Sequence, residues 1–223
     1  MRCLVCNGWA AGLETWSLCA FPHDWIFDYV EQLDGLPERV MADLEDVVLV
    51  GFSMGSTMAL RLFLGHPEKV RGLVLVSGTA RMMEDRATGW KGMSLRRRAA
   101  LRLGTRLVYG NDPSPLYDAR NLERGLDYLQ DADLREELLG RRSADAASRR
   151  ASSGRSAPLD KPDPPVHLFQ SEHDGIVRPE NAAFLKRVFP QARVTMVPGS
   201  EHVLPVAIPE LIDEAVRSCL KTA

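Results

Sequence analysis

The sequence lacks the features that mark several large classes of protein. Its 223 residues include only four cysteines, too few for a disulfide scaffold, and no apolar run approaches the roughly 18 residues that cross a membrane. The N-terminus shows no apolar stretch ending in a small-residue cleavage site. The net charge of −2 gives no overall attraction to nucleic acid or to an anionic membrane. We therefore expect a cytoplasmic globular protein with no nucleic-acid or membrane partner.

Two of the cysteines, Cys3 and Cys6, have the C-x-x-C spacing of redox and zinc motifs. The residues between them, Leu4 and Val5, are apolar, and no second pair of metal ligands follows. We therefore interpret them as buried strand cysteines and expect neither a metal nor a cofactor.

Short apolar runs alternate with helical patterns along much of the chain. Continuously apolar strands with helices between them indicate a parallel sheet covered on both faces, and thus an α/β fold. The predicted helices are residues 57–64, 179–188 and 205–220. The predicted strands lie near residues 3–6, 24–28, 47–51, 72–76, 166–170 and 193–197.

Residues 80–160 depart from this alternation of strands and helices, because they show helical patterns but no strong strand. They carry a net charge of +4, against −6 for the remainder of the chain. We expect residues 1–79 and 161–223 to form the core and residues 80–160 a helical cap insertion, with residues 144–165 as a flexible linker. The arginines are either a solvated helical face or a docking surface for an anionic partner, centred on Arg96, Arg97, Arg98 and Arg102.

The sequence Gly51-Phe52-Ser53-Met54-Gly55 is a G-x-S-x-G motif between a predicted strand and a helical pattern. A tight turn from strand to helix exposes the serine hydroxyl above a sheet, and the glycines leave room for it. This context favours Ser53 as a catalytic nucleophile over a plain Gly-Ser turn.

A serine nucleophile needs a base to take its proton. Five histidines compete for that role, and His202 follows the last predicted strand on a loop, where an open α/β sheet places its site. The others lie in an early loop, at a helix end, within a strand and beside the candidate acid: His23, His66, His167 and His173.

The base in turn needs an orienting carboxylate. Asp174 follows the preceding strand by the same rule, while Glu172 and Asp85 remain alternatives. An oxyanion hole is also required, because stabilisation of the negative oxygen of the tetrahedral intermediate is usually the largest single contribution to the rate enhancement. We expect its two N–H donors to come from Met54, after the nucleophile, and from Trp9, in the loop after the first strand.

These motifs together resemble the α/β-hydrolase superfamily over residues 3–77 and 165–220. Asn7-Gly8-Trp9 stands where many members have His-Gly-Trp, and His66 to Arg71 is similar to the helix exit that follows the elbow. The order Ser53, Asp174, His202 is that of the family. The segment Gly125 to Arg135 looks most like the pimeloyl-[acyl-carrier protein] methyl ester esterases of biotin synthesis.

The resemblance implies an α/β-hydrolase fold, with Ser53, Asp174 and His202 as a catalytic triad and no cofactor. It implies hydrolysis of a small-molecule or carrier-protein-bound ester, with the basic cap docking the acidic carrier. Two alternatives remain open: a thioesterase or acyltransferase acting on carrier-bound acyl chains, and a non-catalytic binding protein of the same fold. Asn7 replaces the usual histidine, so the oxyanion loop is expected to be braced differently.

Overall fold

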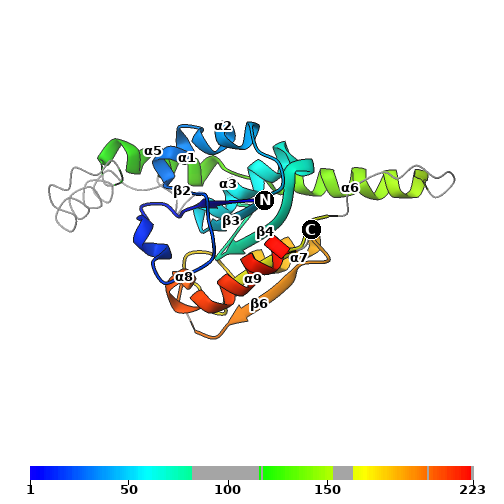
Figure 1. The fold of residues 1–223 in the computed structure, drawn as a ribbon. Coiled ribbons are helices and arrows are strands. Elements are labelled where there is room, and N and C mark those ends of the chain that lie inside the picture. The colour runs from blue at the N-terminus through cyan, green and yellow to red at the C-terminus, as the bar shows by residue number, and fades with distance from the viewer. Residues whose placement is uncertain (82–115, 117, 153–162, 200, 222–223) are drawn as a thin grey trace.

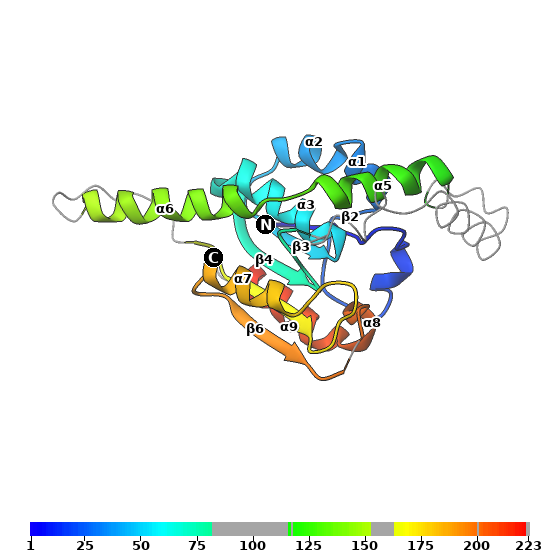
Figure 2. The ribbon, with the colours of Figure 1, turned by 180° about the vertical axis from the view of Figure 1, so that it is seen from behind.

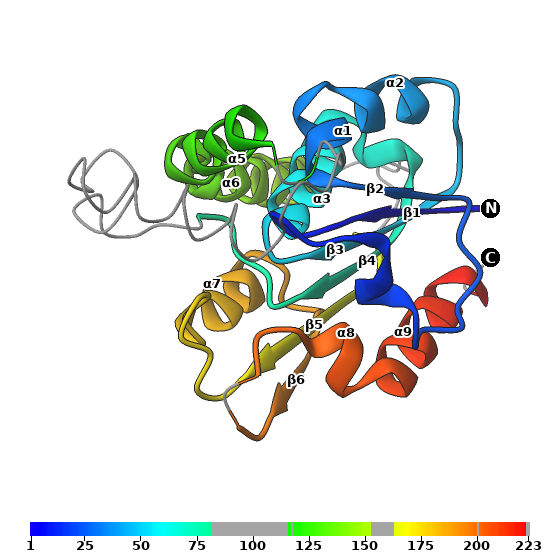
Figure 3. The ribbon, with the colours of Figure 1, turned by 90° about the vertical axis from the view of Figure 1, so that its left-hand side faces the viewer.

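The computed structural model describes residues 1–81, 116, 118–152, 163–199 and 201–221. In these residues six strands form one parallel sheet in the order β2-β1-β3-β4-β5-β6. Figure 1 shows the fold, and Figure 3 shows the strands in this order. The predicted α/β fold with a six-stranded parallel sheet is confirmed, and each strand ends within two residues of its predicted bounds. The strands are β1 (Arg2–Cys6), β2 (Trp25–Phe27), β3 (Val47–Phe52), β4 (Val70–Val76), β5 (Val166–Ser171) and β6 (Arg193–Val197).

Helices cover both faces of the sheet. Figure 3 shows α8 and α9 on one side of it and α1, α2 and α3 on the other. The α-helices are α1 (Tyr29–Leu33), α2 (Leu36–Ala42), α3 (Met54–Gly65), α5 (Ala119–Asp131), α6 (Arg135–Ser152), α7 (Glu180–Val188), α8 (Leu204–Ala207) and α9 (Pro209–Lys221). Short 3₁₀ turns are η1 (Leu13–Trp16) and η2 (Pro67–Lys69).

The alternation of side chains along β3 explains why the sheet has an apolar core on each of its two faces. Val47 and Leu49 pack into the core beneath α2, α3 and α7, while Val48 and Val50 pack into the core beneath η1, α8 and α9. Because successive strand residues point to opposite faces, a strand buried on both sides has to be apolar throughout. The cysteines of the C-x-x-C pair are buried in β1, as predicted.

Two helix predictions are wrong in detail. The segment 144–165 was expected to be a linker, but α6 continues to Ser152, since the alanines and arginines of residues 144–152 favour helix. The helix predicted over 205–220 is divided into α8 and α9. Proline cannot continue a helix but fits a first turn, so α9 begins at Pro209.

The described helices of the predicted insertion are α5 and α6. Figure 2 shows α5 lying over the same side of the sheet as α1 and α3, whereas α6 extends away from the body of the protein. No helix in the described ranges is long and apolar enough to cross a membrane. All six strands are parallel, so their carboxyl ends share one edge of the sheet, and the candidate site lies at that edge.

Candidate active site

Ser53 occupies a strained turn between β3 and α3. Its φ of 53° and ψ of −118° are rare for a residue other than glycine. The glycines on either side permit the turn. A Cβ on Gly51 would lie 2.5 Å from the Cα of Ser56, and one on Gly55 would lie 2.0 Å from the carbonyl oxygen of Cys6. The local sequence therefore dictates a sharp strand-to-helix turn at the serine.

A continuous chain of hydrogen bonds joins three residues that are far apart in the sequence. His202 Nε2 lies 3.0 Å from Ser53 Oγ, and His202 Nδ1 lies 2.8 Å from Asp174 Oδ2. Ser53 and Asp174 are 6% and 4% exposed, whereas His202 is partly exposed. The structure thus brings all three predicted residues together in the order that proton transfer needs.

The surroundings of Asp174 favour its ionised form. Burial by itself raises the pKa of this carboxyl, but hydrogen bonds from His202 and from the backbone amides of Val177 and Ile176 outweigh burial. The pKa of Asp174 is therefore lowered. An ionised Asp174 accepts the Nδ1 proton of His202, which leaves Nε2 as the acceptor for the hydroxyl proton of Ser53.

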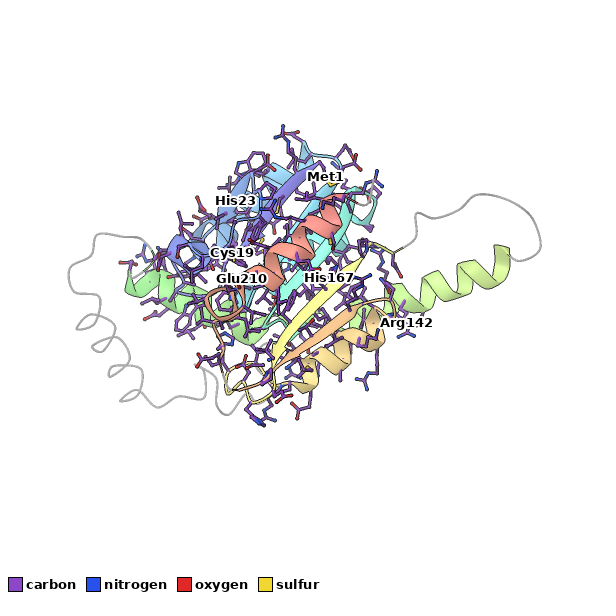
Figure 4. The ribbon with its side chains drawn as sticks, turned by 60° about the horizontal axis from the view of Figure 1, so that its bottom comes forward. Met1, Cys19, His23, Arg142, His167 and Glu210 are labelled. Atoms are coloured by element: carbon purple, nitrogen blue, oxygen red, sulfur yellow. The ribbon has the colours of Figure 1, made fainter. Side chains whose placement is uncertain are left out.

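The four other histidines occupy the positions that the sequence suggests. His167 Nε2 lies 3.1 Å from Ser218 Oγ on α9, and that hydroxyl donates to the carbonyl oxygen of Ala215. Figure 4 shows His167 beside α9. His23 Nδ1 lies 3.3 Å from a backbone oxygen, His66 ends α3, and His173 is exposed.

The alternative acids do not take the place of Asp174. Glu172 is exposed, and its backbone amide donates to the carbonyl oxygen of Val197. Asp85 lies outside the described residues.

The loop after β1 packs directly on the turn that holds Ser53. A Cβ on Gly8 would lie 3.0 Å from the ring of Phe52 and 3.4 Å from the Cβ of Ser53, so a side chain here would require its neighbours to shift by a few tenths of an ångström. The amide of Met54 belongs to the first turn of α3, where N–H groups have no acceptor within the helix. Among the residues that the structure describes, the amide of Trp9 also has no acceptor. Within the described residues, the two amides predicted to bind an oxyanion are therefore not engaged in other backbone hydrogen bonds.

Asn7 braces this loop from the position where histidine was expected. Its Nδ2 donates to the carbonyl oxygens of Ala11 at 2.9 Å and Gly12 at 2.8 Å. Its Oδ1 accepts from the amide of Gly8 at 2.9 Å and from the indole of Trp16 at 3.2 Å. All four hydrogen-bonding positions of the carboxamide are used, so Asn7 fixes the loop without an imidazole.

Two buried polar residues beside the site were missed by sequence reasoning. Ser77, directly after β4, donates its hydroxyl to the carbonyl oxygen of His202 at 2.8 Å. Gln170 Nε2 lies 3.3 Å from Asp174 Oδ2 and 3.0 Å from the carbonyl oxygen of Val177. The signal was available, since each is a polar side chain at the carboxyl end of an apolar strand, the rule that selected Asp174.

The arginine cluster predicted to dock a partner, Arg96, Arg97, Arg98 and Arg102, lies outside the described residues. The described helices of the predicted insertion are attached to α3 by cation–π contacts. Arg61 of α3 lies over the ring of Tyr128 in α5, and Arg141 of α6 lies over the ring of Phe63 in α3.

Comparison with known proteins gives a consistent result. A family model described as alpha/beta hydrolase fold matches residues 7–206. The chain is 27% identical over 204 residues to the pimeloyl-[acyl-carrier protein] methyl ester esterase of Yersinia enterocolitica, covering 77% of this chain and 68% of that protein.

Solved structures share the fold at low sequence identity. A hydrolase from Pseudomonas aeruginosa is 16% identical with a TM-score of 0.65, covering 99% of this chain and 90% of that one. The enol-lactonase of Burkholderia xenovorans is 15% identical with a TM-score of 0.64, covering 98% and 91%.

Proposed function

The chain belongs to the α/β-hydrolase fold family, and on that premise we propose that it hydrolyses carboxylic esters through an acyl-enzyme on Ser53. The observation that carries the proposal is the hydrogen-bond chain from Ser53 through His202 to Asp174. A serine hydroxyl is a poor nucleophile until a base removes its proton. Here the base is within reach, and an ionised, buried carboxylate holds it in place.

Acylation begins when Ser53 Oγ attacks the ester carbonyl carbon and its proton passes to His202 Nε2. The carbon–oxygen bond to the alcohol then breaks, and His202 gives its proton to the departing alkoxide oxygen. Asp174 stays ionised throughout and stabilises the imidazolium that forms. In deacylation, water gives a proton to His202 and attacks the acyl carbon. The bond to Ser53 then breaks, and its oxygen recovers the proton from His202.

The amides of Trp9 and Met54 act on the oxyanion of each tetrahedral intermediate. Both belong to backbone that is already fixed, the loop by Asn7 and the helix start by the strand-to-helix turn. Donors held in advance need no rearrangement as charge develops, and one such donor contributes about 10²- to 10³-fold to turnover.

Two measurements on the purified protein test the proposal. A short-chain nitrophenyl ester should give a burst of nitrophenol close to one equivalent of enzyme, and a fluorophosphonate should modify Ser53, as peptide mass mapping would reveal. Ser53→Ala should lose both signals, and Ser218→Ala, at a second serine whose hydroxyl lies beside a histidine ring nitrogen, should keep both. Wild-type protein that binds the ester without hydrolysing it would identify a non-catalytic member of the fold.

We infer further that the substrate is an acyl methyl ester carried on an acidic carrier protein. Support comes from the similarity to a pimeloyl-[acyl-carrier protein] methyl ester esterase and from the net charge of +4 in residues 80–160. Complementary charge raises the rate of association more than the final affinity, and salt screens it over a Debye length of about 8 Å at physiological ionic strength.

The carrier hypothesis predicts a difference between two substrates. For a carrier-bound ester, kcat/KM should fall as salt rises, and Arg97→Glu with Arg102→Glu should lower it. Arg187→Glu with Lys221→Glu, at two exposed positions outside residues 80–160, reverses the same number of charges and controls for the change in net charge. For a small neutral ester neither salt nor charge reversal should matter. Equal salt sensitivity for both substrates would show that the arginines form a solvated helical face and do not dock a carrier. Hydrolysis of the small ester would still support ester cleavage by Ser53.

A further inference from the structure

Helix α5 packs tightly against the loop that carries Trp9. A Cβ added to Gly125 would lie 2.4 Å from Cδ1 and 2.6 Å from Nε1 of the Trp9 indole. Real Cβ atoms essentially never come within 3.0 Å of another heavy atom, so any side chain at Gly125 must displace something. The indole is not the loose end of a flexible chain, because Trp9 packs against a buried cluster.

The side chains of both proposed oxyanion donors lie in that cluster or pack against it. Met54 is completely buried in it, and Trp9 and Ala10 pack against it. The α5 residues in the cluster are Leu122, Leu126 and Leu129. A single helix therefore packs, through one apolar face, into the same cluster as the two residues whose amides are the proposed donors.

The position of α5 is fixed independently of Trp9. Arg124 Nη2 lies 2.6 Å from Asp34 Oδ1, just after α1, and Tyr29 of α1 donates its hydroxyl to the carbonyl oxygen of Leu116 at 2.5 Å. The contact between Arg61 and Tyr128 ties α5 to α3. A helix attached at several points does not move aside easily when one contact becomes too tight, so the strain passes to the loop.

The described residues hold the indole by packing. Trp9 Nε1 is buried and has no hydrogen-bond partner among them. Ala10, the next residue, has a φ of 55°, a conformation that favours glycine, so the loop is strained beside the indole. Within this part of the chain, no hydrogen bond would restore the indole if its packing changed.

We propose that Gly125 is a positioning residue, whose missing side chain lets α5 hold the Trp9 loop in the conformation that directs its amide at the oxyanion. The inference rests on the proposed esterase function. It assigns to a helix of the predicted insertion a part in turnover, in addition to any part in substrate recognition.

The test compares two identical substitutions. Gly125→Ala should lower kcat for a nitrophenyl ester by about 10- to 100-fold with little change in KM, because a displacement of about 1 Å at an oxyanion donor acts on the transition state. Gly140→Ala, on α6, is the matched control, since a Cβ there meets nothing within 4 Å. It should leave kcat and KM unchanged.

A trifluoromethyl ketone separates positioning from a structural defect. It forms a hemiketal with Ser53 whose negative oxygen occupies the oxyanion hole, so its affinity for Gly125→Ala should fall in parallel with kcat. Trp9→Phe combined with Gly125→Ala gives the helix room. Because the smaller ring relieves the clash, the double variant should have the kcat of Trp9→Phe alone.

Each result bears on one hypothesis or the other. An active wild type and an unaffected Gly125→Ala would overturn the inference and leave the proposed function intact. If Gly125→Ala does not fold, the double variant decides: a kcat equal to that of Trp9→Phe supports the inference, and a further tenfold loss contradicts it. A wild type without esterase activity would remove the proposed function, and this inference with it.

Discussion

The hydroxyl of Ser77 donates to the carbonyl oxygen of His202, 2.8 Å away, and so ties the end of β4 to the loop that carries the proposed base. Ser77 is completely buried and has a φ of 46°, a conformation rarely adopted by residues other than glycine. Its backbone amide is also fixed, by the carbonyl oxygen of Phe169 at 2.8 Å. Ser77, which has a strained backbone conformation, thus helps to hold the backbone of His202 at the carboxyl end of β4.

Replacement of Ser77 should separate its two properties. Ser77→Ala and Ser77→Gly both lose the hydroxyl, so each should lower kcat by about tenfold, equivalent to about 1.4 kcal/mol. Only glycine relieves the positive φ, so Ser77→Gly should be about 1 kcal/mol more stable than Ser77→Ala in urea unfolding. A kcat that follows stability, rather than loss of the hydroxyl, would contradict a role in holding His202.

The proposed triad should behave as one unit. Ser53→Ala, His202→Ala and Asp174→Asn should each lower kcat by several orders of magnitude, and the double variants should lose little more. His173→Ala is the matched control, because His173 is exposed beside Asp174 and should be dispensable. If Ser53→Ala kept more than about a tenth of the rate, a loss under roughly 1.4 kcal/mol, another nucleophile would have to exist.

The carboxamide of Asn7 should be needed for both stability and turnover. Asn7→Asp keeps the shape but loses two donors, so it turns a carboxylate oxygen toward the carbonyls of Ala11 and Gly12. We expect a loss of about 2–5 kcal/mol in the free energy of unfolding and a lower kcat. Asn121→Asp, the same change in the half-buried first turn of α5, should alter stability by less than about 0.5 kcal/mol. Comparable effects of the two changes in urea titrations would contradict the bracing role.

The four thiols should be protected in the folded protein. Burial, with smaller contributions from nearby acidic groups, raises the pKa of Cys3 to about 12 and that of Cys19 to about 12, and burial raises the pKa of Cys219 to about 11. The pKa of Cys6 is also raised, again by burial first. Ellman's reagent at pH 8 should therefore react slowly with the native protein. After unfolding in guanidinium, the four cysteines should release four equivalents of thionitrobenzoate from the reagent. A fast native burst would contradict this protection.

The same shifts predict a loss of stability in alkali. A thiol whose pKa is higher in the folded than in the unfolded state favours folding fully below the unfolded value, about 8.5. That contribution declines as the pH rises above 8.5 toward 11. Unfolding midpoints measured between pH 7 and pH 10 should fall, and a combined Cys3→Ala and Cys219→Ala variant should show a shallower fall. Parallel profiles for the two proteins would assign the alkaline loss to other groups.

The sheet and the arrangement of Ser53, Asp174 and His202 could be predicted from the sequence, because both depend on short-range patterns. An apolar run predicts a strand, and a polar residue just after it lies at the carboxyl edge, so three such residues were expected to meet. The parts that were missed depend on contacts between distant segments. Ser77 has the local signal of a polar residue at the end of an apolar strand, but its partner is a backbone oxygen of a distant loop. Gly125 has no local signal, because it matters only through Trp9, which lies against it. The continuation of α6 to Ser152 was missed because the serine, alanine, arginine and proline content of residues 144–165 suggested a flexible linker.

The parallel topology has a consequence for the order in which the protein matures. Neighbouring strands β4 and β5 pair Leu73 with Val166, so this pairing has to wait until the intervening residues have been synthesised. Strands β1, β3 and β4, with the turn that holds Ser53, can assemble from residues 2–76. Asp174 and His202 emerge from the ribosome much later, since chains are synthesised at about 5–20 residues per second and domains generally form N-terminal first. On the proposed function, the nascent chain therefore carries Ser53 in its turn for several seconds without the proposed acid and base, and hydrolysis becomes possible only after both have emerged.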